Sequence, residues 1–171
     1  IYVGTFAKLL FPALRLGFVV VPETFPQGIA QALSTTGQFA PLLLQAAIAD
    51  FIVEGHMSQH LKRMRRIYAE RRRAFYQICE EQLGDFMELL PAEAGIQVVG
   101  RLRHGLEDVV VAEAASALGV NVSPLSKYFQ SRPPMQGLVL GYAGCDKLQT
   151  EQGIRQLRKA FMKAGARAAS A

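Results

Sequence analysis

Hydrophobic positions along the chain form short continuous runs near the start and longer stretches with a helical period further on. The runs at 1–3 and 16–21 predict two buried strands, the second ended by Pro22, with an irregular loop at 4–14 between them. Strands that are apolar throughout are usually covered on both faces, so these favour an α/β sheet. Segment 23–41 is punctuated by proline and glycine, with helical stretches possible between them.

A helical pattern begins at Leu42 and continues to about Leu83. Gly55 is its one weak point, and Gly84 provides a natural C-terminal stop. The pattern predicts either one long connecting helix or two helices in tandem.

After Gly84 the chain predicts a mixture of short strands and helices. Strands are predicted at 86–90, 96–102, 120–124 and 138–142, and helices at 107–118 and 150–164. Such an order favours a compact α+β subdomain.

The composition is that of a folded protein without membrane spans. The 171 residues are 50% hydrophobic, enough to bury a core in one domain or two small ones. Charged residues interrupt every long apolar run, and the first residues do not resemble a secretion signal. Cys79 and Cys145 lie far apart without metal-ligand spacing, which indicates two free thiols and a cytoplasmic location.

The net charge of +5 is a local property, because seven basic residues lie between Lys62 and Arg73. A basic stripe of this kind allows a nucleic-acid contact. Apolar residues recur through the run at helical spacing, at Leu61, Met64, Tyr68, Phe75 and Ile78. We therefore favour the solvated or interdomain face of an amphipathic helix over direct DNA contact.

His56 and His60 are four residues apart on the predicted helix, a spacing that can hold a metal ion. The sequence places no third ligand beside them, so we expect no metal site and assign the pair a surface or capping role.

Lys8 is the strongest candidate for chemistry, because it stands among apolar residues such as Phe6 and Phe11. A desolvated lysine amine is reactive and forms Schiff bases with carbonyl compounds. The hydroxyl of Thr5 and the guanidinium of Arg15 bracket it and suit a phosphate group. One cofactor combines an aldehyde with a phosphate, namely pyridoxal 5'-phosphate (PLP). The spacing alone also fits solvated loop charges on an ordinary α/β scaffold.

The segment YVGTFAKLLFPALRLGFVVVP resembles the lysine segment of fold-type I PLP enzymes. The resemblance is strongest to MocR-type regulators of the GntR superfamily, whose pattern is Tyr-x-Gly-Thr-Phe-Ser-Lys-x-Leu-x-Pro-x-Leu-Arg-Leu-Gly. It continues through residues 40–73 and through the stretches LGVNVSPLSKYF and GLVLGYAG, and so covers nearly the whole chain.

The resemblance implies a role for three residues. Lys8 becomes the catalytic, Schiff-base lysine, and Thr5 and Arg15 become ligands of the PLP phosphate. Ala7 replaces a serine that is common in the family. Aminotransferases of this type often carry an arginine for the substrate α-carboxylate where this chain has Val139, which counts against ordinary transamination.

The resemblance also implies an organisation. Residues 1–41 are the C-terminal piece of a large PLP-binding domain, 42–84 the connecting helix or helices, 85–165 a small α+β subdomain and 166–171 a frayed tail. Because Ile1 to Val3 read as a strand already under way, we expect a fragment of a longer protein. The other cofactor contacts and a winged helix-turn-helix for DNA are expected upstream.

Two functions follow from the resemblance, and a PLP-free scaffold remains as a third reading. In the first, the chain is the effector-sensing part of a DNA-binding regulator, cytoplasmic and homodimeric, that responds to PLP or to an amine or amino-acid effector. In the second, it is part of a class I/II PLP-dependent aminotransferase. The turn at 122–129 is expected near the cofactor, where Tyr128 could line an effector pocket.

Overall fold

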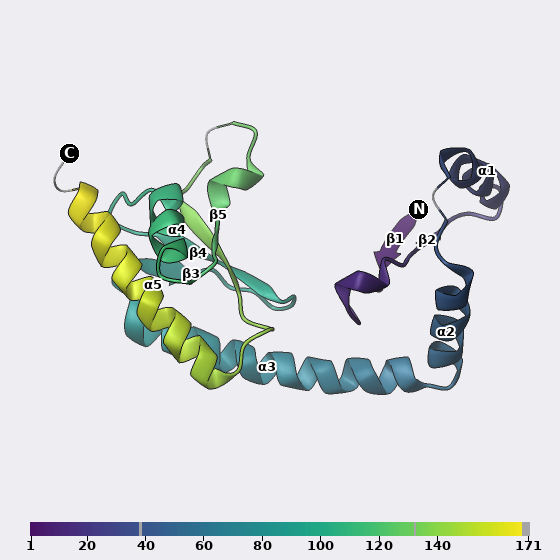
Figure 1. Ribbon diagram of the computed structural model, residues 1–171, viewed down its shortest axis with the longest axis horizontal. Coiled ribbons are helices and arrows are strands. Elements are labelled where there is room, and N and C mark those ends of the chain that lie inside the picture. The colour runs from purple at the N-terminus through teal and green to yellow at the C-terminus, as the bar shows by residue number, and fades with distance from the viewer. Residues whose placement is uncertain (38, 132, 169–171) are drawn as a thin grey trace. The chain divides into compact units, whose positions relative to one another are not determined.

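A computed structural model describes the chain at residues 1–37, 39–131 and 133–168, with side chains through residue 165 in the last helix (Figure 1). The chain forms two compact units, Ile1–Met64 and Arg65–Ala171, which are described separately.

The first unit begins with a β-hairpin. Strands β1 (Tyr2–Thr5) and β2 (Gly17–Val20) pair antiparallel, with Thr5 opposite Gly17. A 3-10 helix, η1 (Pro12–Leu14), lies in the connection. Both strands are largely exposed, so the prediction that they are buried is wrong for the described chain. The physical reason is that a two-stranded sheet has too few neighbours to cover its own faces.

Three helices follow: α1 (Pro26–Thr36), α2 (Leu42–Val53) and α3 (His56–Leu83). Gly55 separates α2 from α3 with a φ of 80°, a left-handed conformation that favours glycine. The tandem alternative for residues 42–83 is therefore correct. Across the described residues, no helix is both long and apolar enough to cross a membrane.

The second unit is an antiparallel sheet with helices against it. Its strands are β3 (Met87–Leu89), β4 (Gln97–Leu102), β5 (Ser123–Pro124) and β6 (Gly137–Gly141). They are ordered β3-β4-β6-β5. Its other elements are α4 (Asp108–Ser116), the 3-10 helix η2 (Leu125–Tyr128) and α5 (Lys147–Ala168). Helix α5 thus extends past residue 165, and residues 169–171 of the predicted tail lie outside the described residues.

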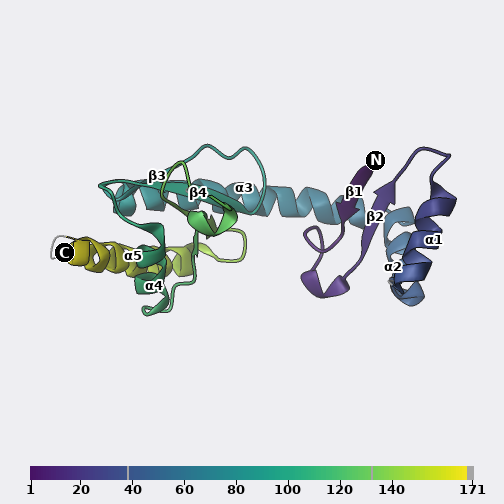
Figure 2. The same ribbon diagram turned by 90° about the horizontal axis from the view of Figure 1, so that it is seen from above.

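One face of this sheet carries the core. Val98 and Leu140 pair across β4 and β6 and are buried with residues of α3, α4 and α5. Figures 1 and 2 both show α4 beside α5. Because side chains alternate along a strand, the neighbouring pair Val99 and Val139 belongs to the opposite face and is only half-buried. The sheet thus has one packed face and one open face.

Candidate functional site

The hairpin brings Thr5, Lys8 and Arg15 to its closed end. Thr5 ends β1, Lys8 lies in the following turn, and Arg15 stands two residues before β2. The strand register continues past Thr5 through a hydrogen bond in which the Phe6 N–H donates to the Leu16 carbonyl at 3.0 Å. This continuation places Arg15 opposite the turn that carries Lys8.

Local hydrogen bonds define the turn. The Thr5 hydroxyl oxygen accepts from the Ala7 N–H at 3.1 Å and lies 3.4 Å from the Leu16 carbonyl oxygen, to which it donates. The Phe6 carbonyl accepts from the N–H groups of Leu9 and Leu10 at 3.1 and 2.9 Å. Thr5 is therefore already a structural residue of the turn, because its side chain fixes the backbone that leads into Lys8.

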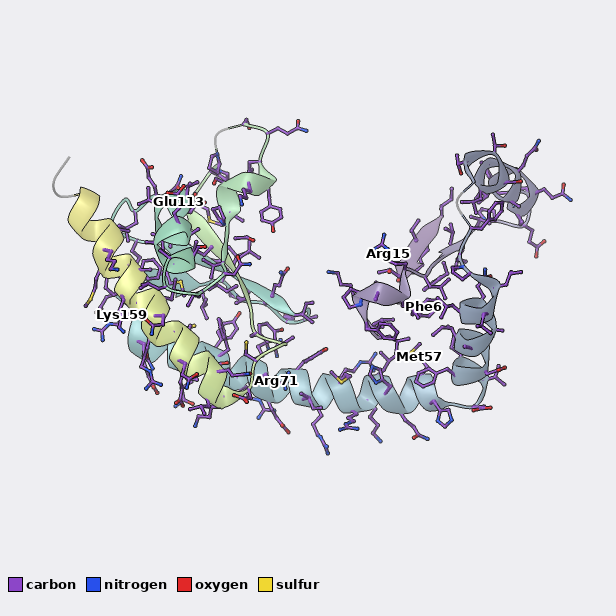
Figure 3. The ribbon with its side chains drawn as sticks, in the orientation of Figure 1. Phe6, Arg15, Met57, Arg71, Glu113 and Lys159 are labelled. Carbon is purple, nitrogen blue, oxygen red and sulfur yellow. The ribbon has the colours of Figure 1, made fainter. Side chains whose placement is uncertain are left out.

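Arg15 has an unusual backbone, with φ of 49° and ψ of 32°. This left-handed conformation costs a non-glycine residue about 1 kcal/mol. It turns the chain from η1 into β2, and Arg15 donates its N–H to the Pro12 carbonyl at 3.4 Å. Figure 3 shows Arg15 and Phe6 at this end of the hairpin. Strain of this kind clusters at functional sites, where the surrounding structure maintains it.

Lys8 is exposed on the described chain. For the residues that the structure describes, the prediction that apolar neighbours desolvate Lys8 is therefore wrong. Phe6 packs on Phe18 instead, with ring centroids 5.3 Å apart, and Phe11 is 53% exposed. The residues that the structure describes do not form a dry pocket around the amine.

The chemistry of the three side chains fits a phosphate-bearing aldehyde. A hydroxyl at the end of β1 stands at the same end of the hairpin as a primary amine and a planar guanidinium in the connection to β2. The guanidinium fork and the hydroxyl are donors suited to phosphate oxygens, and the amine is the group that reacts with an aldehyde.

The turn that carries Lys8 is hydrogen-bonded to the start of α3. His60 Nε2 lies 2.9 Å from the Leu9 carbonyl oxygen and donates to it, and Met57, one turn earlier, is buried. His56 pairs with Glu54 at 3.1 Å instead. Among the described residues, no group of three or more His, Cys, Asp or Glu side chains is placed to hold a metal ion. The contact between His60 and Leu9 spans 51 residues, so sequence spacing carried no signal for it.

In the second unit, Val139 occupies the centre of the open sheet face. It lies opposite Val99 on β4 and Ser123 on β5. The three residues form a row of small and apolar side chains across the sheet.

A buried carboxylate in the second unit was missed in the sequence. Asp108 begins α4 and is 1% exposed. Its oxygens accept from the N–H and the hydroxyl of Ser126, both at 2.8 Å. These bonds hold η2, on which Tyr128 is 64% exposed. An acidic residue at a helix start was the one available signal, and it indicates a cap rather than a long-range partner.

The basic run on α3 is only partly a solvated face. Phe75 and Ile78 are buried on the inner side of the helix, as the pattern predicts. Arg71 and Arg72, however, are half-buried and donate to backbone carbonyls of the same unit, Arg71 to Ala143 and Arg72 to Ala92 at 2.7 Å. Two of the seven cations therefore stabilise the fold.

Comparison with known proteins places these features in a family. The model of the family "Aminotransferase class I and II" matches residues 1–157. The probable rhizopine catabolism regulatory protein MocR of Rhizobium meliloti is 51% identical over 95% of this chain and 33% of its own length. An uncharacterized HTH-type transcriptional regulator of Bacillus subtilis, YhdI, is 30% identical over 94% of this chain and 34% of its own length.

Among solved structures, LysN of Thermus thermophilus superposes with a TM-score of 0.87 at 27% identity, over 96% of this chain and 42% of that one. LysN is an alpha-aminoadipate aminotransferase, solved with N-(5'-phosphopyridoxyl)-L-leucine. The chain spans about a third of the length of these two regulators. The resemblance to MocR-type regulators is thus confirmed, and the chain belongs to the aminotransferase class I and II family, whose fold it has.

Proposed function

We propose that this chain is the PLP-binding, effector-sensing part of a MocR-type, GntR-superfamily transcription regulator. The observation that carries the proposal is the gathering of Thr5, Lys8 and Arg15 at one hairpin end. The regulatory relatives, at 51% and 30% identity along almost the whole chain, support a regulator over other members of the family.

In this proposal Thr5, Lys8 and Arg15 each have a separate role. Arg15 binds two oxygens of the cofactor phosphate through its guanidinium fork. The Thr5 hydroxyl gives up its 3.4 Å contact with the Leu16 carbonyl and donates its one proton to a third phosphate oxygen. Lys8 presents its amine to the cofactor aldehyde. PLP, when bound, supplies a carbonyl that captures amines and a ring that withdraws electrons.

Val139 supports a sensing role over catalytic turnover. An arginine at this strand position would hold an α-carboxylate in a fixed orientation, which turnover requires. Valine offers no such contact, and its cross-strand neighbours Val99 and Ser123 carry no charge. An amine or amino-acid effector then acts by shifting the population between two arrangements of the protein rather than by being consumed.

The proposal extends to the full-length protein and its domains. DNA binding is assigned to a winged helix-turn-helix upstream of Ile1, and the working form to a cytoplasmic homodimer. Residues 1–41 are then the end of the large domain, 42–84 the connection and 85–165 the small subdomain.

Reductive trapping in the full-length protein tests the cofactor assignment. The protein is incubated with PLP, reduced with borohydride and digested, and the peptides are weighed by mass spectrometry. We expect a phosphopyridoxyl adduct on Lys8, its loss in Lys8→Ala, and its retention in Lys127→Ala, which removes another exposed lysine. An adduct spread over surface lysines, or none, would refute the assignment.

A catalytic aminotransferase is the second candidate, favoured by the TM-score of 0.87 to LysN. In that case Lys8 also moves a proton during turnover. Sustained conversion of an amino donor and a 2-oxo acid by the full-length protein, absent in Lys8→Ala, would establish it. Effector-dependent DNA binding without such turnover would establish the regulator.

A further inference from the structure

A pocket in the second unit lies between one face of α3 and the loop that joins β3 to β4. Arg65, Tyr68, Ala69 and Arg72 have the spacing i, i+3, i+4, i+7 and so share that face. The cavity is about 440 Å³, within the range of roughly 300–1,000 Å³ that is usual for small-molecule sites. Its lining is Arg65, Tyr68, Ala69, Arg72, Glu93, Ala94, Gly95 and Tyr142.

The wall formed by the loop is held in place by side-chain donors. Arg72 Nη1 donates to the carbonyls of Ala92 and Glu93 at 2.7 and 2.5 Å. The Tyr142 hydroxyl donates to the Gly95 carbonyl at 2.7 Å. Three loop carbonyls are thus already engaged, and the wall is formed before any ligand arrives, which reduces the ordering cost of binding.

The polar groups of the lining that do not hold the loop are mainly hydrogen-bond donors. A guanidinium has five N–H bonds, so Arg72 keeps donors on Nη2 and Nε while Nη1 holds the loop. Arg65 adds a second guanidinium and Tyr68 a hydroxyl. Burial raises the pKa of Tyr142, an effect that the nearby Arg72 charge opposes, so this hydroxyl keeps its proton at neutral pH. That proton is already donated to the Gly95 carbonyl, so Tyr142 adds no further donor.

The charge balance of the lining selects the kind of anion. Two arginines against Glu93 leave one net positive charge. A monoanion neutralises this charge, whereas a dianion leaves one negative charge without a partner in the pocket. The Glu93 carboxylate repels either anion. The side chain of Ala69 and the rings of Tyr68 and Tyr142 add apolar surface for a carbon skeleton.

We propose that this pocket binds a small organic acid through a single carboxylate, with Arg65 and Arg72 as its ligands and the tyrosine rings against its carbon skeleton. Neither PLP nor Lys8 takes part, so the inference goes beyond the proposed function. The site gives the protein a second ligand class besides the amines that a PLP aldehyde captures.

Calorimetric titration of the full-length protein with benzoate and with pentanoate tests the site, with benzamide and pentanamide as neutral probes. We expect saturable binding of at least one acid and none of its amide. Arg65→Gln removes a fork from an exposed residue and is expected to weaken binding at least tenfold. Glu93→Gln removes the repulsion and is expected to strengthen it severalfold.

Arg66→Gln is the matched control, because Arg66 is exposed on the same helix and does not line this pocket. Its affinity is expected to equal that of the unmodified protein. The proposal is overturned if neither acid binds, if the amide binds equally well, if Arg65→Gln leaves the affinity unchanged, or if inorganic phosphate binds more tightly than both acids. Lys8→Ala is expected to leave acid binding intact, which separates this result from the cofactor assignment.

Discussion

The Asp108 carboxylate receives both the N–H and the hydroxyl of Ser126, each at 2.8 Å, across 18 residues of sequence. Asp108 is 1% exposed, and a longer contact at 3.5 Å from the Gly137 N–H completes its environment. The pair thereby fixes η2 to the start of α4. It links the helical core to the turn that carries Tyr128.

Asp108→Ala is expected to lower the free energy of unfolding by about 3 kcal/mol, because it leaves buried N–H groups without an acceptor. Ser126→Ala removes only the hydroxyl and is expected to cost about 1 kcal/mol. Urea unfolding of both variants and of the double variant measures their coupling. Glu113→Ala, at an exposed position of α4 (Figure 3), is the control and is expected to change stability by less than about 0.5 kcal/mol. Additive losses would show that the two side chains act independently.

Gly55→Ala is expected to destabilise the first unit by about 1 kcal/mol, because φ is 80° at the junction of α2 and α3 and a Cβ atom is strained there. Gly28→Ala is the matched control. Gly28 is exposed within α1, and nothing lies within 4 Å of an added Cβ. Alanine is therefore expected to stabilise α1 by about 0.5–1 kcal/mol. Opposite shifts of the melting temperature would confirm that backbone conformation, rather than space, decides at Gly55.

Cys79 and Cys145 are expected to differ in reactivity. Burial raises the pKa of the Cys79 thiol from 9.0 to about 12, so it has almost no thiolate at pH 8. Cys145 is only half-buried in a loop. A thiol reagent at pH 8 should label Cys145 in the native protein and reach Cys79 only on unfolding. Equal labelling rates would contradict the packing of Cys79.

The same shift predicts an alkaline loss of stability. The unfolded chain releases the Cys79 proton from about pH 9, whereas the folded chain retains it until about pH 12. The contribution of this group is therefore constant below pH 9. It falls above that value by at most about 1.4 kcal/mol per pH unit. Cys79→Ala should flatten the stability profile between pH 9 and 12, and Cys145→Ser should not.

Local patterns predicted the elements of this chain well, since each depends on residues close in sequence. Gly55 was recognised as the weak point of a helical stretch because its lack of a Cβ is a local property. Burial of the hairpin was not predictable, since apolar strands are buried only where other elements cover them. Contacts such as Arg72 with Ala92 and Asp108 with Ser126 join residues 18 to 20 apart on different elements, and no periodicity encodes them.

The candidate site was likewise predictable from the sequence only in part. Thr5, Lys8 and Arg15 were found because their types and spacing match a family pattern, and the hairpin register brings them together. The exposure of Lys8 was not foreseen, because a residue's solvent contact depends on all the surfaces around it. The pocket beside Arg65 left no sequence signal beyond a basic run, since its other wall comes from residues 93–95 and Tyr142.

Thr5→Val in the full-length protein is expected to weaken PLP binding at least tenfold, measured by equilibrium titration. The substitution removes a phosphate donor and also the oxygen that accepts from the Ala7 N–H at 3.1 Å. Thr5→Ser retains the hydroxyl and is expected to stay within threefold. Arg15→Gln removes the guanidinium fork and is expected to exceed the effect of Thr5→Val. An unchanged affinity in both would remove Thr5 and Arg15 from the phosphate site.

Val139→Arg tests whether the open sheet face decides between sensing and turnover. The added guanidinium starts from the row formed with Val99 and Ser123, which holds no charge of its own. A carboxylate-bearing amino acid then gains a bidentate contact that the valine cannot provide. We expect the affinity of the PLP-loaded, full-length protein for such amino acids to rise at least tenfold, while its affinity for simple amines stays the same.

Val139→Met is the control, because it adds length without charge and should leave both affinities unchanged. Since Val139 is half-buried, the melting temperature of each variant shows whether the face accepts the longer side chain. A gain for amino acids and amines alike would mean that the substitution opens the site without recognising the carboxylate. The assignment of this strand position to carboxylate binding would then be wrong, and Val139 would no longer argue for a regulator.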